Sequence, residues 1–508
     1  MGSFDLAWSA APTRGTSVSK PGTRQILIAF AAFSALRILL AATLPLSFDE
    51  SYFWLWSRHL ALSYYDHPPL IALAIRLGTW LFGDTVLGVR AVPLAASLAT
   101  CWAVWQAGRV LFNDERTAAI AAGLLSVTLM FTAESLGATP DALVLAASAF
   151  LLWSMAKLEA THDGRWWLAA GLAAGAALLS KYTAFFLVAS AGLWLLATPR
   201  GRAWLRTPWP YMGGLIAAAC LAPNLYWNAL HGWISFKFQF GRVSEGHFTL
   251  RYLGEFALAQ LALASPFVLI LGIAGLAGET RLTKAVRPLA FAAAIVWPGA
   301  LYFLVHCLHD RVQGNWPSFV YPALCLLAAP VFAAPRREGA AQAVLALSRR
   351  LAFPTAVLML LACYAQAFTH VVPLGARDPL ARMTAMGFEP VARDISNLAR
   401  QRHAAAIVTT KYVVTGWLSF YLKPRLPVVQ MSQDERWLEA PRAGTALLSG
   451  PLLYVTQHPD RELPLISGRF AAVEPLGALT RKEDGAAIDK VYVYALSGFR
   501  GGDTGRLP

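Results

Sequence analysis

Charged residues are scarce in this sequence. Only 14% of its 508 residues are Asp, Glu, Lys or Arg, and 56% are apolar, whereas a soluble protein carries about 25% charged residues. The apolar residues form long uncharged runs, such as 207–230 and 256–278. Runs of about 20 apolar residues are long enough to cross a bilayer as helices. The composition therefore excludes an ordinary cytosolic enzyme and predicts a polytopic membrane protein.

Cysteine is also rare, and its spacing excludes two kinds of scaffold. The five cysteines lie in or beside apolar runs, and none forms a C-x-x-C pair. We therefore expect neither a disulfide framework nor a zinc cluster. His306 and His309 have a spacing compatible with a metal, but no third ligand is in register, so we predict no metal and no cofactor. The net charge of +14 comes without a basic cluster interleaved with aromatics, which argues against nucleic acid as a partner.

Apolar windows of the required length predict an all-α bundle of about eleven membrane spans. The predicted spans are 24–45, 87–108, 117–134, 140–157, 166–180, 182–198, 209–228, 255–277, 288–306, 316–334 and 351–371. Residues 68–82 are apolar but too few to span, so we expect a helix lying on the membrane surface. The bundle domain would thus cover residues 24–371, with a first outer loop at 46–86 and a cytoplasmic tail at 1–23.

The distribution of Lys and Arg predicts the orientation. If the N-terminus is cytoplasmic, the cytoplasmic loops carry an excess of Lys and Arg over acidic residues, and the opposite loops do not. Positive loops stay in the cytoplasm, so an odd number of spans places residues 372–508 outside. We therefore expect a bacterial inner-membrane protein whose last segment is periplasmic.

The last segment, 372–508, has a different composition. It contains 30 of the 72 charged residues, which predicts a small α/β domain outside the bilayer. The patterning indicates a helix and three strands, with loose loops around 424–441. The helix is expected at 389–402, and the strands at 404–410, 452–456 and 490–496.

Two acidic residues directly follow the first predicted span. Asp49 and Glu50 lie among aromatic residues that include Phe48 and Tyr52. Adjacent carboxylates at a membrane surface are often just the start of a solvated loop. The aromatic surroundings favour partial burial instead, which would tune the acidity of a general base.

Further polar residues lie at the outer ends of other spans. Tyr65 and His67 precede a stiff Pro-Pro pair, where the simpler interpretation is an interfacial tyrosine anchor. Lys181 is a lone cation between two apolar runs, so it either snorkels to the interface or binds a lipid phosphate. Asp141 lies in a tight outer turn, and Arg242 is a candidate anion contact.

Taken together, these motifs resemble the dolichyl-phosphate-mannose protein mannosyltransferase superfamily of membrane glycosyltransferases, and in particular the lipid A aminoarabinose transferase branch. The resemblance covers nearly the whole chain, and it depends on the order of the motifs and on their placement at outer span ends. The motifs are Phe48-Asp49-Glu50, Tyr65-Asp66-His67-Pro68-Pro69-Leu70, Ala138-Thr139-Pro140-Asp141, Leu179-Ser180-Lys181-Tyr182-Thr183, Pro223-Asn224-Leu225-Tyr226-Trp227-Asn228 and Gly314-Asn315-Trp316-Pro317.

The resemblance implies a GT-C fold with its active site at the extracytoplasmic face. It implies a polyprenyl-phosphate-linked sugar as donor, a lipid or glycan as acceptor, and an inverting mechanism. In this interpretation Asp49 activates or orients the acceptor with Glu50 beside it, and Lys181 lies near the donor phosphate. The aminoarabinose branch has a lysine where this sequence has His67, so either another cation such as Arg242 compensates or the donor geometry differs.

Two other classes of function fit a polytopic chain. A lipid or glycan transporter, such as a flippase, would be expected to show inverted repeats or charges at mid-membrane, and the sequence shows no repeat. A non-catalytic envelope assembly protein would not need polar residues gathered at the outer span ends. The transferred sugar and the acceptor, whether lipid A, another envelope glycan or a protein, stay open at this point.

Overall fold

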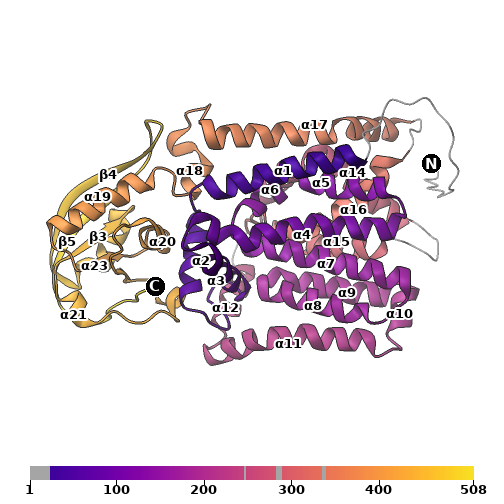
Figure 1. The fold of residues 1–508 in the computed structure, drawn as a ribbon. Coiled ribbons are helices and arrows are strands. Elements are labelled where there is room, and N and C mark those ends of the chain that lie inside the picture. The colour runs from indigo at the N-terminus through magenta and orange to yellow at the C-terminus, as the bar shows by residue number, and fades with distance from the viewer. Residues whose placement is uncertain (1–22, 245–247, 282–288, 335–338) are drawn as a thin grey trace.

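The computed structural model describes residues 23–244, 248–281, 289–334 and 339–508. Its long helices run side by side along one axis, and a β-sheet lies beyond one end of them (Figure 1). The helices of the bundle are α1 (Thr23–Thr43), α4 (Val86–Phe112), α5 (Glu115–Ser126), α6 (Leu129–Leu136), α7 (Pro140–Thr161), α8 (Trp166–Ser180), α9 (Phe185–Ala197), α11 (Trp209–Leu230), α13 (Arg251–Ala264), α14 (Pro266–Arg281), α15 (Ala290–His306), α16 (Tyr321–Ala333) and α17 (Ala340–Thr369). The elements that connect them or lie at their ends are α2 (Phe48–Arg58), α3 (Leu70–Phe82), η1 (Tyr182–Ala184), α10 (Pro199–Trp204), α12 (Ile234–Ser244) and η2 (Ser318–Val320).

Several helices have the length and composition of membrane spans. Within the described residues, α4, α7 and α17 each pass this test alone. The pair α5 and α6, bent by 66°, and the pair α13 and α14, bent by 101°, pass it when each is counted as one span. Most of the other bundle helices are shorter apolar helices, including α8, α9, α15 and α16. The structure therefore contains three to five clear spans by these criteria.

Small residues allow the bundle helices to approach closely. A Cβ added at Gly171 of α8 would lie 2.2 Å from the carbonyl oxygen of Gly213 in α11. A Cβ at Gly213 would lie 2.4 Å from the carbonyl oxygen of Trp167. Such close packing of helix backbones is a main source of association inside a membrane, where apolar side chains gain nothing by leaving the lipid.

Helix α3 presents apolar residues to the outside. Leu73, Leu77 and Trp80 are 45%, 48% and 77% exposed, whereas Ile71 and Ile75 are fully buried. One face of the helix therefore packs on the protein and the other is an exposed apolar stripe. This pattern is typical of a helix that lies in a membrane interface, as predicted for residues 68–82.

The C-terminal part is a five-stranded mixed sheet with helices. The strand order is β2-β1-β3-β5-β4, in which β1 is parallel to β2 and β3, and β5 is antiparallel to β3 and β4. The strands are β1 (Ala406–Thr409), β2 (Val428–Gln430), β3 (Leu452–Thr456), β4 (Phe470–Glu483) and β5 (Ala486–Phe499). The helices of this part are η3 (Gly375–Arg377), α18 (Pro379–Met383), α19 (Phe388–Gln401), α20 (Tyr412–Tyr421), η4 (Asp434–Trp437), α21 (Thr445–Leu448), α22 (Pro459–Glu462) and α23 (Pro464–Ser467).

The patterning of this part predicts α19, β1, β3 and β5 near their observed positions, but it misses two strands. Strand β4 has no buried-exposed alternation that would reveal it. The segment 424–441, predicted as loose loops, contains β2 and η4. With three residues, β2 is too short to produce a sequence pattern of its own, and it forms because β1 lies beside it.

One hydrophobic core joins residues 46–86, the predicted outer loop, to the C-terminal part. Tyr52 and Trp56 of α2 belong to the same buried cluster as Trp417 of α20 and Ile407 of β1. Helices α2 and α20 touch so closely that a Cβ at Gly416 would lie 2.6 Å from the Ser51 hydroxyl oxygen. The C-terminal sheet is therefore packed directly on the loop that carries Asp49.

Candidate functional site

Helix α2 begins with a capping box that places Asp49 in its first turn. The Ser47 hydroxyl oxygen accepts a hydrogen bond from the Glu50 amide at 3.1 Å, and the Glu50 carboxylate accepts one from the Ser47 amide at 2.8 Å. This reciprocal pair satisfies amide groups that a helix leaves unpaired at its start. The side chain of Asp49 is thus directed from a fixed helix end.

Glu50 is a fully paired buried carboxylate. It accepts two hydrogen bonds from Arg90 at 2.6 and 2.7 Å, and one from the Ala138 amide at 2.8 Å. Burial alone would raise the pKa of Glu50, but the ion pair with Arg90 and these hydrogen bonds outweigh it and lower the pKa. Glu50 is therefore ionised, and it holds α2 against α4 and against the turn before α7.

Asp49 is half-buried in the first turn of α2. The Tyr412 hydroxyl, at the start of α20, interacts with its carboxylate and lowers its pKa. Burial and the nearby carboxylate of Asp66 raise the pKa of Asp49 to about 7, against the lowering effect of Arg436. A base whose pKa lies near the working pH is the most effective proton acceptor.

Beside Asp49, an acidic residue of the outer loop meets an arginine from the C-terminal part. Asp66 forms an ion pair with Arg436 of η4, and it accepts a hydrogen bond from the Tyr52 hydroxyl at 2.8 Å. The Arg436 guanidinium also lies over the ring of Tyr412 at 4.7 Å and the ring of Tyr65 at 5.5 Å. Burial and Asp66 raise the pKa of Tyr52, which therefore stays protonated.

Tyr65 and His67 flank Asp66 in the same loop. The Tyr65 ring packs on Phe238 of α12 at 4.5 Å, and the His67 ring meets the edge of Phe53 at 5.8 Å. Arg242 also lies in α12, but its side chain falls outside the described residues. The structure therefore brings Asp49, Tyr52 and Tyr65 together and leaves the prediction for Arg242 as it was.

Lys181 and Asp141 form a second buried cluster at the same end of the bundle. The Lys181 ammonium donates to both carboxylate oxygens of Asp141, at 2.8 and 2.6 Å. Asp141 also accepts hydrogen bonds from Ser318 at 2.5 Å and from Asn315 at 3.1 Å. Lys181 is only 6% exposed, so its charge is already paired within the protein.

The two clusters are adjacent in the fold. Thr139 caps the start of α7, which carries Asp141, and the preceding amide of Ala138 donates to Glu50. The partner of Lys181, Asp141, thus lies only three positions after Ala138, whose amide anchors Glu50 of α2. Helix α2 lies at the end of the bundle next to the C-terminal sheet (Figure 1), and Lys181 is linked to this helix through Asp141 and the Ala138 amide.

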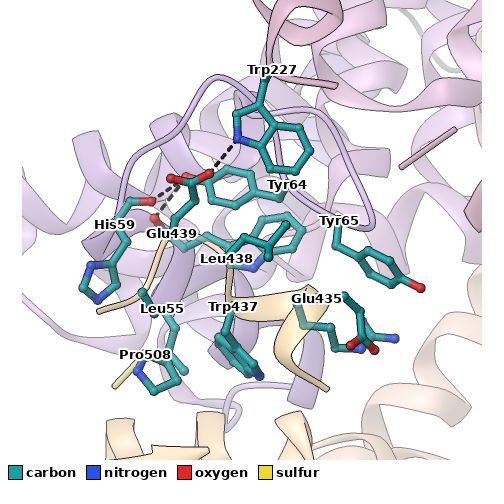
Figure 2. A pocket seen from close by; sticks show the side chains of 13 residues that line it. Leu55, His59, Tyr64, Tyr65, Trp227, Glu435, Trp437, Leu438, Glu439 and Pro508 are labelled. Atoms are coloured by element: carbon teal, nitrogen blue, oxygen red, sulfur yellow. Dashed lines mark hydrogen bonds between the residues drawn. The ribbon is translucent and has the colours of Figure 1, made fainter. Parts of the chain in front are cut away.

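A small recess of about 20 Å³ opens between the outer loop and the C-terminal segment 435–440. Figure 2 shows Tyr64, Tyr65 and Trp227 around it, with the Trp227 indole donating to Glu439 at 2.6 Å. Arg436 lines the recess, and so does Tyr65, whereas Asp49 and Lys181 do not. In the described part of the chain, no group of three or more His, Cys, Asp or Glu side chains is placed to hold a metal ion.

Two residues of this site carry no sequence signal. Arg436 lies 370 positions from Asp66, in a segment that reads as a loop, and Tyr412 is one of 15 tyrosines. Asp66 lies in the motif of residues 65–70, but the sequence favours its two neighbours, Tyr65 and His67, as binding residues. Neither Arg436 nor Tyr412 has a local pattern that distinguishes it from an ordinary surface residue.

The fold itself is known from solved structures. The chain is similar to ArnT from Cupriavidus metallidurans, both in the apo state and bound to undecaprenyl phosphate, with TM-scores of 0.60 and 0.61 and 16% identity. The two alignments cover 93% and 94% of this chain and 98% of the ArnT chains. This protein therefore has the ArnT-like fold, a helical membrane bundle that carries a C-terminal α/β unit.

Sequence comparison gives the family resemblance. Residues 66–227 match the model of the dolichyl-phosphate-mannose-protein mannosyltransferase family. The chain is also 26% identical over 422 residues to the lipid A galacturonosyltransferase RgtD of Rhizobium johnstonii, covering 80% of this chain and 85% of RgtD. The predicted resemblance to this superfamily of membrane glycosyltransferases is confirmed.

Proposed function

We propose that this protein is an integral membrane glycosyltransferase that moves a sugar from a polyprenyl-phosphate donor to lipid A or another envelope glycan. The family match and the similarity to RgtD support a transferase with a lipid A acceptor. The ArnT structure with undecaprenyl phosphate supports a polyprenyl-phosphate donor. The single observation that carries a mechanism is the place of Asp49 in the first turn of α2, beside Asp66, where burial and that second carboxylate raise its pKa to about 7.

We also propose the predicted topology of eleven spans, with the C-terminal unit in the periplasm. Each of the eleven predicted windows contains an apolar helix or one of the two bent helix pairs. The excess of Lys and Arg on alternate loops supports a cytoplasmic N-terminus. Residues 372–508 would then form the periplasmic domain, and 24–371 the membrane domain.

The proposed reaction is an inverting displacement. The acceptor hydroxyl loses its proton to the Asp49 carboxylate as its oxygen attacks the anomeric carbon of the sugar. The bond between that carbon and the phosphate oxygen breaks, and the polyprenyl phosphate leaves with the bonding electron pair. The reaction thus needs a base on the acceptor side and positive charge on the leaving side.

The neighbours of Asp49 support distinct roles. Glu50 has its contacts within the protein and would position α2. The charge of Lys181 is neutralised by Asp141, which favours a positioning role for Lys181 over direct contact with the donor phosphate. Tyr412 would orient Asp49, because its hydroxyl favours the ionised form of the carboxylate.

The test has a cellular and a purified arm. In a deletion strain, mass spectrometry of envelope lipids and glycans should show the loss of one sugar mass, which names the product. In the purified protein, Asp49→Asn should lower the transfer rate at least about 100-fold, the lower range for general base catalysis. An unchanged envelope in the deletion strain would favour a transporter, and full turnover by Asp49→Asn would remove Asp49 from the mechanism.

A further inference from the structure

A polyprenyl-phosphate donor brings negative charge to a site that is already acidic. Asp49 and Asp66 lie close enough for each charge to affect the other. A leaving phosphate beside two carboxylates needs a cation, since developing charge in a poorly solvated site is stabilised by preorganised donors. The source of that cation determines how the donor is held.

Two buried cations near this site are already fully engaged. Arg90 donates to Glu50 and to the backbone carbonyls of Ala41, Leu44 and Pro45. Lys181 donates to both oxygens of Asp141. Withdrawing either one would leave a buried carboxylate without its cation.

Arg436 is held differently. It is paired with one carboxylate, Asp66, which keeps a second partner in the Tyr52 hydroxyl if the arginine moves. Its charge also acts on Asp49, and its guanidinium lies over three tyrosine rings, at 4.7 Å for Tyr412, 5.5 Å for Tyr65 and 5.7 Å for Tyr52. Aromatic faces stabilise a guanidinium without occupying its N–H groups, and a guanidinium has five such donors in a fork that matches phosphate geometry.

Arg436 is also accessible. Its side chain is 17% exposed, and it borders the small recess between the outer loop and segment 435–440. Segment 435–440 reaches this place from the end of β2, in the C-terminal unit. Arg436 thus comes from the C-terminal unit, whereas the acidic residues beside it belong to the outer loop.

We propose that Arg436 binds the donor phosphate in this protein, exchanging its ion pair with Asp66 for contacts to the phosphate oxygens. This inference rests on the proposed function, because it assumes a polyprenyl-phosphate ligand. In the structure described here Asp66 occupies the place of the incoming anion. The C-terminal unit therefore contributes a binding residue to the active site.

The chain offers a matched control in Arg425. This residue also belongs to the C-terminal unit, pairs with an acidic residue of the outer loop, Asp84, at 3.0 Å, and lies over an aromatic ring, that of Trp54, at 5.4 Å. It differs from Arg436 because Asp84 has a second cation in Arg58 and because it does not line the recess. If the two arginines only held the C-terminal unit against the outer loop, replacing either one should weaken binding to the same extent.

The test measures the binding of undecaprenyl phosphate to the full-length protein in nanodiscs, by tryptophan fluorescence. Arg436→Met should raise the dissociation constant at least tenfold, and Arg425→Met less than twofold. Arg436→Lys should be intermediate, because an ammonium keeps the charge but not the fork. Equal dissociation constants for wild type and Arg436→Met, with unchanged circular dichroism, would overturn the inference.

Asp66→Asn separates direct binding from a positioning role. If Arg436 only holds Asp66 in place, Asp66→Asn should weaken binding as much as Arg436→Met does. If Arg436 binds phosphate, Asp66→Asn removes its competitor, and binding should be unchanged or tighter. Equal weakening in both variants would therefore contradict direct binding.

Failure of this inference can be told apart from failure of the proposed function. A wild-type protein that transfers sugar, together with normal binding by Arg436→Met, would refute only the role of Arg436. A wild-type protein that binds undecaprenyl phosphate through Arg436 but transfers no sugar would refute only the transferase. A wild-type protein that does not bind undecaprenyl phosphate would refute both.

Discussion

At the scale of the single residue, Asp49 shows how environment sets chemistry. Glu50 is the next residue in the chain, and yet its pKa is lowered while that of Asp49 is raised to about 7. The difference comes from their partners, since Glu50 meets Arg90, whereas Asp49 meets a second carboxylate, Asp66. Pairs of acids with divergent pKa values are typical of acid-base sites.

This raised pKa leads to a prediction about pH. A base works only when deprotonated, so transfer by the wild type should fall about tenfold per pH unit below pH 7. Asp66→Asn removes an anion that raises the pKa of Asp49, so the acid limb of the pH profile should move to lower pH. The measurement is kcat/KM for the acceptor between pH 5 and 9.

The same profile contains its own control. Tyr52→Phe removes a hydrogen bond to Asp66 without changing the charge of either acid, so the midpoint of its acid limb should move less than that of Asp66→Asn. If the acid limb of the kcat/KM profile has the same midpoint in Asp66→Asn as in the wild type, a group other than Asp49 sets that midpoint.

At the scale of the helix, the pair of Lys181 and Asp141 links the end of α8 to the start of α7. Ser318 and Asn315 add hydrogen bonds from the segment before α16. Three helix ends are therefore tied to one carboxylate. The motifs around 139–141, 180–183 and 314–317 converge here, which explains why these short polar stretches interrupt an otherwise apolar sequence.

Breaking this pair should cost stability. Lys181→Met leaves a buried carboxylate unpaired, which typically costs about 3–5 kcal/mol. The double variant Lys181→Met with Asp141→Asn removes both charges and should recover part of the loss. The midpoint of thermal unfolding in detergent measures the effect.

An exposed ion pair provides the comparison. Arg109 and Glu115 are 2.8 Å apart, with side chains 47% and 42% exposed, and such pairs contribute about 0–1 kcal/mol. Arg109→Met should therefore barely change the midpoint. If Lys181→Met unfolds like wild type but loses affinity for undecaprenyl phosphate, the positioning role would be wrong and the original phosphate role correct.

At the scale of the whole molecule, the site exists only where two parts of the chain meet. Asp49 and Asp66 come from the outer loop, and Tyr412 and Arg436 come from the C-terminal unit. Their common core includes Trp56 and Trp417. Separating the two parts would leave acids without their orienting and neutralising partners.

The contact between α2 and α20 tests this dependence. In Gly416→Ala, the added methyl group would lie 2.6 Å from the Ser51 hydroxyl oxygen and must push the helices apart. We expect transfer to fall at least tenfold. Gly444→Ala is the control, because a Cβ at Gly444 meets nothing within 4 Å, and normal transfer by Gly416→Ala would show that the site tolerates a looser contact.

Much of this molecule can be predicted from its sequence, and the limits have a physical cause. The bundle helices, α3 and Asp49 are encoded locally, by apolar runs and by polar residues at their ends. The pairing of Asp66 with Arg436 depends on how the sheet docks on the outer loop, and no local pattern specifies docking. The same holds for Lys181, whose sequence position suggests a free cation and whose charge is neutralised by Asp141.

The exposed apolar stripe of α3 has a consequence for how the lipid donor is met. With Leu77 and Trp80 turned outward, the helix would float at the boundary between headgroups and acyl chains. Helix α3 follows directly on the loop that carries Asp66. Its position in the interface would therefore set how far the proposed reaction centre lies above the hydrocarbon core. A carrier lipid could then be used while its tail stays dissolved in the bilayer, with only its headgroup lifted into the enzyme.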